Sequence, residues 1–510
     1  MELNIVKTSI NTYLGQKGYT IPKNEISIEK QNQIKKDLMV RPYTPGAPGN
    51  GGDTTFPVYR ESSNKLYVPH YYGVEQFGPP KEIKISEGTD INLEFNGQLR
   101  ENQELVVKTY VDFVTKEGYG GGLIELPCGA GKTVNGLKII YELKKKTFII
   151  VHKEFLMNQW IERIQQFLPK ARVGKIQGQI IDIDDKDIVI GMLQSLSMKE
   201  YPASLFESFG LTIIDEVHHI SSEVFSNSLF KLVTKYMLGL SATMNRKDGT
   251  TKVFKMFLGD VIFKGKREEQ HEVIVRAIEY YVNDEEFNHE ATDFRGNPAY
   301  STMICKLCEY NRRSEFILKV LTDMLIENPN QQIIVMGHNK NLLKYLYDAI
   351  KHRNISTVGY YIGGMKESAL KESESKQIIF STYQMCSEGL DIKSLTTLVM
   401  VTPKTDIEQS IGRILREKHS QPVVVDIIDS HSIFQNQWKK RRTFYIKENY
   451  KIIHTTNSKY NTDTTSSDWE TFYEPGEKAK KYCKKIQKKE DDNLLQGQCL
   501  IKLKKIIYNI

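Results

Sequence analysis

The chain has 510 residues, of which 40% are hydrophobic and 26% charged, so it has enough apolar material for more than one folded domain. The net charge of +7 is moderate and favours a polyanionic partner only weakly. Six scattered cysteines exclude a disulfide scaffold. Neither a signal peptide nor an apolar run near the ~20 residues of a membrane helix is present, so we expect a soluble intracellular protein.

The first half of the chain divides into two regions. Residues 1–95 have an irregular pattern and are interpreted as an N-terminal accessory region. In residues 96–265, short apolar runs alternate with helix-length amphipathic segments, which predicts a parallel sheet buried on both faces. The predicted strands are 122–126, 147–151, 187–190, 211–214 and 237–240.

The second half begins with a charged stretch, 266–300, interpreted as a connector. The same alternation then resumes over 301–450 and predicts a second α/β domain. Its predicted strands are 332–336, 356–362, 377–381, 397–401 and 423–428. Residues 451–510 are interpreted as a linker and a lysine-rich tail, which could be either a solvated helix face or a phosphate-contacting patch.

A glycine-rich loop follows the first predicted strand. The sequence from Leu126 to Thr133, LPCGAGKT, precedes a helical pattern, as in a phosphate-binding loop. Its glycines let backbone N–H groups face phosphates, its lysine can reach the β- and γ-phosphates, and its threonine can hold Mg²⁺. Leu126 departs from the glycine of the strict pattern. The predicted ATP-binding residues here are Gly129, Ala130, Gly131, Lys132 and Thr133.

Paired carboxylates end the strand at 211–214. Asp215 is predicted to hold Mg²⁺ together with Thr133, and Glu216 to orient or deprotonate the attacking water. An apolar strand ending in two acids is the partner that a phosphate-binding loop requires. The two motifs together therefore predict an ATPase with ATP and Mg²⁺ as its cofactors.

The sequence DEVH at 215–218, with Ser241-Ala-Thr243 after the next strand, resembles motifs II and III of superfamily 2 helicases. The sequence QSIGRILR at 409–416 fits motif VI of the same family. The resemblance implies two tandem RecA-like domains and assigns coupling of ATP to nucleic acid to Ser241 and Thr243. It implies that Gln409 positions the water and that Arg413 and Arg416, on one helix face, stabilise the γ-phosphate.

Weaker matches extend the resemblance. LRENQ at 99–103 resembles the Q motif, in which Gln103 would read adenine and Arg100 would lie near the base. The segment 380–392 resembles motif V, in which Gly389 and Asp391 would face ATP. Segments in the positions of motifs Ia, Ic, IV and V supply the predicted nucleic-acid contacts Lys153, Gln194, Ser195, His338, Ser381 and Thr382.

The strings LPCGAGKT, SATMNRKDG at 241–249 and QNQWKKRRTFY at 435–445 are similar to the branch containing XPB-type and phage UvsW-type helicases and the poxviral transcript-release helicases. A compact chain with a short N-terminal arm looks like a member from a large cytoplasmic DNA virus of poxvirus or asfarvirus type. The resemblance implies 3′→5′ movement on DNA, a link to viral transcription or repair, and a place in the host cytoplasm and the virion. The DEVH box and Ser410 argue against a routine DEAD-box RNA unwinder.

Other functions stay open at this point. The partner could be RNA, since both nucleic acids are gripped through the backbone, or the motor could translocate without separating strands. A scaffold with an inactive ATP site is disfavoured by the intact motifs. A helicase–nuclease is disfavoured because Asp426, Asp429 and His431 follow a core strand and are expected to cap it.

Overall fold

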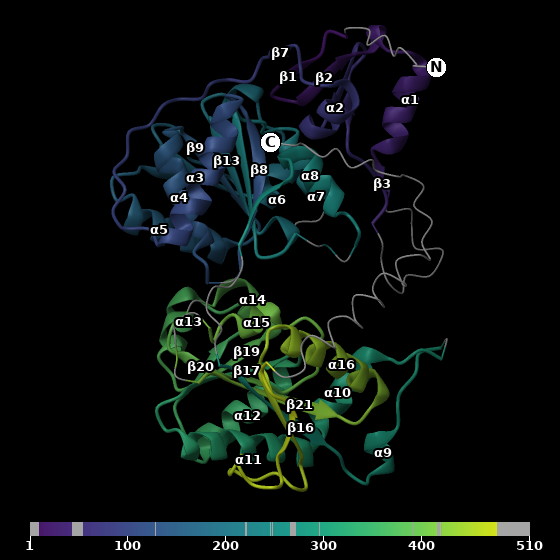
Figure 1. Cartoon of the computed structure of the whole chain (residues 1–510), viewed down its shortest axis with the longest axis vertical. Coiled ribbons are helices and arrows are strands. Elements are labelled where there is room, and N and C mark those ends of the chain that lie inside the picture. Colours follow the sequence, from purple (N-terminus) through teal and green to yellow (C-terminus); the bar gives the residue numbers. More distant parts are fainter. Residues whose placement is uncertain are drawn as a thin grey trace. The chain divides into compact units, whose positions relative to one another are not determined.

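The structure is a computed structural model. It describes residues 10–42, 55–127, 129–219, 222–244, 246, 248–265, 272–294, 296–390, 392–415, 419 and 421–476. The chain forms two compact units, Met1–Glu268 and Glu269–Ile510 (Figure 1). Among the described residues, no helix is both long and apolar enough to cross a bilayer.

The N-terminal part of unit 1 is a small sheet with the strand order β5-β6-β2-β1-β7. One face of this sheet is apolar and joins the core beneath α7 and α8, so the small sheet and the main fold of unit 1 share one core. The elements of this part are β1 (Tyr13–Gly15), β2 (Gly18–Pro22), η1 (Lys23–Glu25), α1 (Ile28–Asp37), β3 (Met39–Val40), β4 (Phe56–Pro57), β5 (Arg60–Glu61), β6 (Lys65–Val68), α2 (His70–Phe77) and β7 (Glu82–Ile83).

The main sheet of unit 1 has the order β11-β10-β12-β9-β13-β14-β8-β15 and is parallel except at β11. Helices α3, α4 and α5 cover one face, and α6, α7 and α8 cover the other, which is why the strands are apolar throughout. The strands are β8 (Gly120–Glu125), β9 (Thr147–Val151), β10 (Val173–Gln177), β11 (Ile180–Ile181), β12 (Ile188–Met192), β13 (Leu211–Asp215), β14 (Tyr236–Ser241) and β15 (Val261–Lys264). The helices are α3 (Glu101–Lys116), α4 (Lys132–Leu143), α5 (Glu154–Phe167), α6 (Leu193–Met198), η2 (Ala203–Phe206), η3 (Val217–His219), α7 (Ser222–Leu229) and α8 (Thr251–Leu258).

Unit 2 repeats this plan with the order β18-β19-β17-β20-β21-β16-β22-β23, parallel except at β23. Its core lies on both faces of the sheet, with α11 and α12 on one face and α14 and α15 on the other. The strands are β16 (Ile274–Tyr280), β17 (Gln332–Gly337), β18 (Val358–Tyr361), β19 (Ile378–Thr382), β20 (Leu395–Met400), β21 (Val423–Asp429), β22 (Lys451–Thr456) and β23 (Glu470–Tyr473). The helices are α9 (Glu285–Asn288), α10 (Tyr300–Glu309), α11 (Asn311–Glu327), α12 (Lys340–His352), α13 (Glu367–Glu374), α14 (Tyr383–Gly389), α15 (Glu408–Ile411) and α16 (Ser432–Lys447).

All ten predicted strands are present, and the α/β fold with two parallel sheets is confirmed. The structure differs from the sequence interpretation at β16 and β22. Both are central strands of unit 2, yet they lie in stretches interpreted as a connector and a linker. β16 was not recognised because a charged residue, Arg276, interrupts its apolar pattern. Arg276 is buried there because it pairs with Glu327 at 2.5 Å. β22 carries polar residues, so its apolar run is too short to be recognised.

Candidate functional site

Three neighbouring strands of unit 1 bring the first motifs together. β14 pairs with β13 and β8, and its register sets Leu240 opposite Asp215 and Ser241 opposite Glu125. Because these strands are parallel, their carboxyl ends lie at one edge of the sheet. The glycine-rich loop, the paired carboxylates and Ser241 therefore meet at that edge.

The glycines of the loop are needed for its backbone. Gly129 and Gly131 have φ values of 85° and 78°, in the left-handed region that favours glycine. Gly131 also has no room for a side chain, because a Cβ there would lie 2.2 Å from Nε2 of Gln103. Gly131 caps the N-terminus of α4, so the positive end of that helix faces the loop.

Lys132 and Glu216 form an ion pair across this edge. Lys132 Nζ lies 2.8 Å from Oε1 of Glu216. Thr133 is the next residue of α4, so its hydroxyl belongs to the first turn of the helix. The predicted phosphate-binding lysine and the predicted base are thus in direct contact.

Asp215 is nearly inaccessible and holds two hydrogen bonds. Trp160 Nε1 donates to its Oδ2 at 2.9 Å, and the backbone N–H of Glu216 donates to its Oδ1 at 3.0 Å. Burial, followed by the charge of Glu216, raises the pKa of Asp215 to about 6, against the opposing effect of Lys132. A carboxylate desolvated in this way is strongly stabilised by an added cation.

The residues after Asp215 are held in a strained, connected arrangement. Glu216 has a φ of 49°, which is costly for a residue with a side chain and is typical of functional sites. His218 Nδ1 lies 2.5 Å from Ser241 Oγ and 3.4 Å from Glu216 Oε2. Ser241 Oγ in turn donates to the carbonyl of Thr243 at 2.6 Å. The predicted coupling residues are therefore linked to Glu216 through His218.

Arg246 holds the backbone at His218 in place. Its Nη1 donates to the carbonyl of His218 at 2.6 Å, and its Nη2 lies 2.5 Å from Oδ2 of Asp248. This guanidinium holds the pKa of Asp248 well below its usual range. The loop after the neighbouring strand β14 thus fixes the backbone that follows the acidic pair.

Gln103 contacts the loop itself. Its Oε1 accepts from the backbone N–H of Arg100 at 3.0 Å, and its Nε2 lies 3.5 Å from the carbonyl of Ala130. Arg100 is the exposed N-cap of α3. The glutamine predicted to read adenine is thus engaged in holding the loop and the start of α3.

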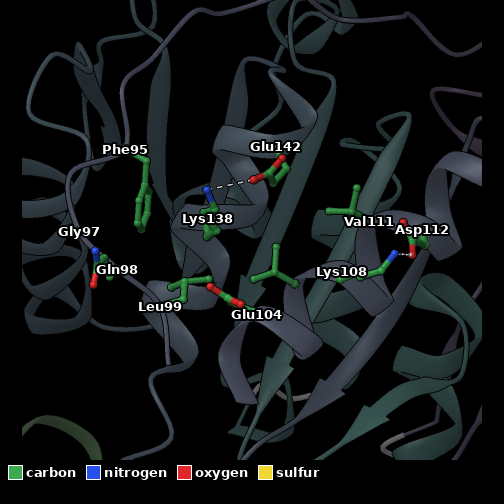
Figure 2. Close-up of a pocket in the computed structure, with 11 residues that line it drawn as sticks. Phe95, Gly97, Gln98, Leu99, Glu104, Lys108, Val111, Asp112, Lys138 and Glu142 are labelled. Atoms are coloured by element: carbon green, nitrogen blue, oxygen red, sulfur yellow. Dashed lines mark hydrogen bonds and ion pairs between the residues drawn. The ribbon is translucent and has the colours of Figure 1, made fainter. Parts of the chain in front are cut away.

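A pocket of about 630 Å³ adjoins this segment between α3 and α4 (Figure 2). Leu99 and Glu104, on either side of the Arg100–Gln103 turn, contribute to its wall. The lysines of the pocket are matched by carboxylates in the ion pairs Lys108–Asp112 and Lys138–Glu142. Because its cations are neutralised, the pocket offers little attraction for phosphates compared with the loop.

The predicted nucleic-acid contacts of unit 1 differ in accessibility. Lys153 is the N-cap of α5, and burial lowers its pKa. Gln194 is exposed, and its side chain donates to the carbonyl of His152 at 3.0 Å. Ser195 is buried, and its hydroxyl accepts from the backbone N–H of Gly178 at 3.0 Å. Gln194 is the accessible polar group of the two on α6.

In unit 2, the three predicted contacts differ in accessibility, and His338 is the exposed one. Ser381 is fully buried, and its hydroxyl donates to the carbonyl of Tyr361 at 2.9 Å. His338 Nδ1 lies 2.9 Å from Thr402 Oγ1, and partial desolvation, followed by the charge of Lys404, lowers the pKa of this histidine to about 4. Thr382 caps α14 by accepting from the backbone N–H of Met385. A direct phosphate contact by Ser381 is therefore not supported, because its hydroxyl is committed inside the fold.

Motifs V and VI are joined through Arg413. Its Nη1 donates to the carbonyl of Leu390 at 2.8 Å, one residue beyond Gly389 at the end of α14. Gln409 lies on the short helix α15. Arg416 and Asp391 lie outside the described residues.

The sequence interpretation missed three side chains of this site. Trp160 lies on α5 and His218 stands within the DEVH box, but nothing in their spacing showed that they would contact Asp215 and Ser241. Arg246 lies in a loop whose proximity to the acidic pair depends on the β13–β14 pairing. The Arg-x-Asp spacing of residues 246 and 248 is the available signal, since such pairs often form bidentate contacts.

Comparisons with known proteins show the family of this chain. A family model described as the res subunit of type III restriction enzymes matches residues 96–246. A protein of Acanthamoeba polyphaga mimivirus, whose name describes an ATP-dependent RNA helicase, is 36% identical over 88% of this chain and 87% of its own length. A protein of African swine fever virus, with a name of the same kind, is 28% identical over 69% of this chain and 73% of its own length.

Among solved structures, phage T4 UvsW covers 84% of this chain and 96% of its own, with 18% identity and a TM-score of 0.32. The identity to the mimivirus protein over most of both chains determines the family. The chain belongs to the superfamily 2 helicases of large DNA viruses, which are nucleic-acid-dependent ATPases.

Proposed function

We propose that this helicase hydrolyses ATP at the carboxyl edge of the unit 1 sheet and moves 3′→5′ along DNA during viral transcription or repair. The observation that carries the proposal is the contact of Lys132 with Glu216 beside the desolvated Asp215, at the mouth of a glycine loop. A cation, a base and a metal-seeking carboxylate at one helix N-terminus are the parts that phosphoryl transfer to water requires.

The chain's residues have distinct roles in this proposal. Backbone N–H groups of the loop at 129–131 and the α4 N-terminus bind the phosphates, and Lys132 leaves Glu216 to reach the β- and γ-phosphates. Glu216, released from that ion pair, accepts a proton from the attacking water. Gln409, Arg413 and Arg416 position the water and stabilise the developing negative charge, as the family motif implies.

Mg²⁺ fits the residues on this edge. Asp215 and the Thr133 hydroxyl are oxygen ligands of the kind that Mg²⁺ prefers, and a cation would remove the cost of burying the ionised Asp215. When bound, the ion would neutralise charge on the phosphates. Trp160 keeps one lone pair of the Asp215 carboxylate occupied and so fixes which oxygen faces outward.

RNA is the second candidate substrate. The names of the mimivirus and African swine fever virus relatives describe RNA helicases. We nevertheless favour DNA, because the strings LPCGAGKT and SATMNRKDG resemble the XPB and UvsW branch. Action within the viral transcription machinery, in the host cytoplasm and the virion, belongs to the same proposal.

The deciding experiment is steady-state ATP hydrolysis with no polynucleotide, single-stranded DNA, duplex DNA or RNA. We expect DNA to raise turnover several-fold above RNA. Equal or greater stimulation by RNA would assign the RNA role instead. A strand-displacement assay with 3′- and 5′-tailed duplexes then separates an unwinding enzyme from a translocase that leaves strands paired.

A further inference from the structure

We propose that the open face of the N-terminal sheet is a second binding site for single-stranded nucleic acid, separate from the motor motifs. The site consists of Tyr13 and Tyr67 as stacking platforms, with Lys17, Lys65 and Lys84 around them; these five residues are called the tyrosine face. The proposal goes beyond the motor function and rests on an independent part of unit 1.

Strand register defines this face. Thr20 pairs with Tyr13 on one side and with Tyr67 on the other, so the three residues form one row across β1, β2 and β6. Side chains alternate along a strand, so the neighbouring residues point to the opposite face. That opposite face carries the buried side chains of Leu14, Tyr19, Ile21, Leu66 and Val68.

The row leaves the two tyrosine rings at the surface. Thr20 is 1% exposed because the rings flank it, whereas Tyr13 and Tyr67 are themselves half-buried. Neighbouring strands are about 4.8 Å apart, so the rings stand about 10 Å apart with β2 between them. Gly15 and Gly18 pair at the end of the same face, and the Tyr13 ring lies over Gly15, where a Cβ would be 3.3 Å from a ring carbon.

Lysines surround both rings. Lys17 Nζ lies 5.4 Å from the centre of the Tyr67 ring, and Lys65 and Lys84 lie 5.3 Å and 4.5 Å from that of Tyr13. Such exposed cation–π contacts are weak and are readily exchanged for contacts with phosphate. One carboxylate, Glu82, shares the face and pairs with Lys84 at 2.6 Å.

This combination favours a single-stranded polynucleotide over other polyanions. Aromatic rings at the surface bind bases through their π-faces, and nearby cations follow the backbone, without regard to sequence. A duplex hides its base faces inside the stack and would leave the tyrosines without partners. An acidic protein would use the lysines but gain little from the rings.

The sheet also has a rigid link to the motor fold. Arg60, at the end of the same row, donates to Asn227 on α7, and its guanidinium lies 5.7 Å from the Phe230 ring. Helix α2 packs on both β2 and α8. A strand held on the tyrosine face is therefore held at a fixed position relative to the ATP-binding edge of unit 1.

Binding by the full chain is measured by fluorescence anisotropy, without ATP, for twelve-nucleotide thymidine DNA, twelve-nucleotide uridine RNA and a twelve-base-pair duplex. The variant Tyr13→Leu/Tyr67→Leu keeps Thr20 covered but removes the π-faces, and we expect it to bind the single strands on the order of tenfold more weakly. Lys17→Gln/Lys84→Gln should weaken binding similarly and reduce the salt dependence by about two ions. Tyr13→Phe/Tyr67→Phe retains the rings and should bind like the wild type, which controls for folding.

Lys319 provides a matched control. It lies 4.6 Å from the Tyr460 ring and 2.9 Å from a carboxylate of Asp323, and its side chain is 55% exposed, against 54% for Lys84. Lys319→Gln should change affinity by less than twofold. Unchanged binding by the leucine and glutamine variants of the tyrosine face would overturn the proposal. So would binding of the duplex as tight as that of the single strands, or equal competition by an oligoglutamate.

Rates of ATP hydrolysis by the same variants distinguish a failure of this proposal from a failure of the proposed motor function. The leucine and glutamine variants should keep the wild-type rates of ATP hydrolysis without polynucleotide and at saturating polynucleotide. They should need a higher polynucleotide concentration to reach half of the maximal stimulation. Tyrosine-dependent binding without any stimulation in the wild type would support this site and contradict the motor function. Normal stimulation curves in all variants would contradict this site alone. A difference in affinity between the thymidine DNA and the uridine RNA identifies which single-stranded nucleic acid this site prefers.

Discussion

The two units share a sheet plan but hold the buried carboxylates of their strands in opposite ways. In unit 2, Asp426 and Asp429 on β21 are fully buried and are held by bidentate contacts from Arg441 and Arg313. In unit 1, Asp215 is also buried, but its hydrogen bonds come from an indole and a backbone N–H.

The difference separates structural from functional carboxylates. A guanidinium neutralises each aspartate of β21, so these residues brace α11 and α16 against the sheet. The capping role expected from sequence is wrong for Asp426, which lies in the middle of β21. Lys132, whose charge acts on Asp215, is instead paired with Glu216, and the pKa of Asp215 is raised. A buried acid left in this condition is poised to receive a metal ion.

The most damaging change should be Lys132→Ala. It removes the cation that reaches from α4 to Glu216 and, in our proposal, to the phosphates, so we expect ATP turnover to fall at least on the order of a hundredfold. The control is Lys138→Ala on the same helix, whose lysine pairs with Glu142 in the pocket wall. Near-normal turnover in Lys132→Ala would remove this edge from the mechanism, and equal losses in both variants would indicate damage to α4.

Exchanging an aspartate for asparagine in each unit tests the comparison directly. Asp426→Asn leaves Arg441 buried without its counter-charge and should lower the free energy of unfolding by about 3–5 kcal/mol. Asp215→Asn should change stability by less than about 1 kcal/mol, because it removes a desolvated charge, yet it should abolish turnover. Urea unfolding of both variants, with ATP hydrolysis beside it, measures the contrast. Reversed stabilities would contradict the division into structural and functional acids.

Sequence patterns predicted the parts of this molecule that depend on local order. The ten strands were recognisable because a strand covered on both faces is apolar throughout, and the loop and acidic pair because each is contiguous. β22 was not recognisable because of its polar residues. β16 was not recognisable, since Arg276 is tolerated in it only through its distant partner Glu327. For the same reason the contacts of Trp160 with Asp215 and of Ser381 with Tyr361 follow from tertiary packing.

Trp160→Phe tests whether the indole hydrogen bond orients Asp215 for Mg²⁺. The variant keeps the buried ring but removes the hydrogen bond to Oδ2, so the carboxylate loses one of its two fixed positions. We expect the Mg²⁺ concentration that gives the half-maximal rate of ATP turnover to rise roughly tenfold, because Mg²⁺ binds more weakly. The control is Trp469→Phe, which removes an indole hydrogen bond to the carbonyl of Asn461 in unit 2. An unchanged Mg²⁺ requirement would leave Trp160 as a packing residue.

The smallest effect concerns His338 and the pH dependence of stability. Partial desolvation of the imidazole beside Tyr383, followed by the charge of Lys404, lowers its pKa to about 4, so the folded protein binds fewer protons here than the unfolded chain between about pH 6.5 and pH 4. Stability from this residue is therefore complete above pH 6.5 and is lost as the pH falls. Because His338 is more than a third exposed, solvent screening weakens this effect, and His338→Gln should lessen the drop in unfolding free energy between pH 7.5 and pH 5.5 by less than about 1 kcal/mol. Because His338 is uncharged at neutral pH, the same variant should leave the salt dependence of polynucleotide binding unchanged. A smaller salt dependence in His338→Gln would instead show that a charged histidine contacts the phosphates.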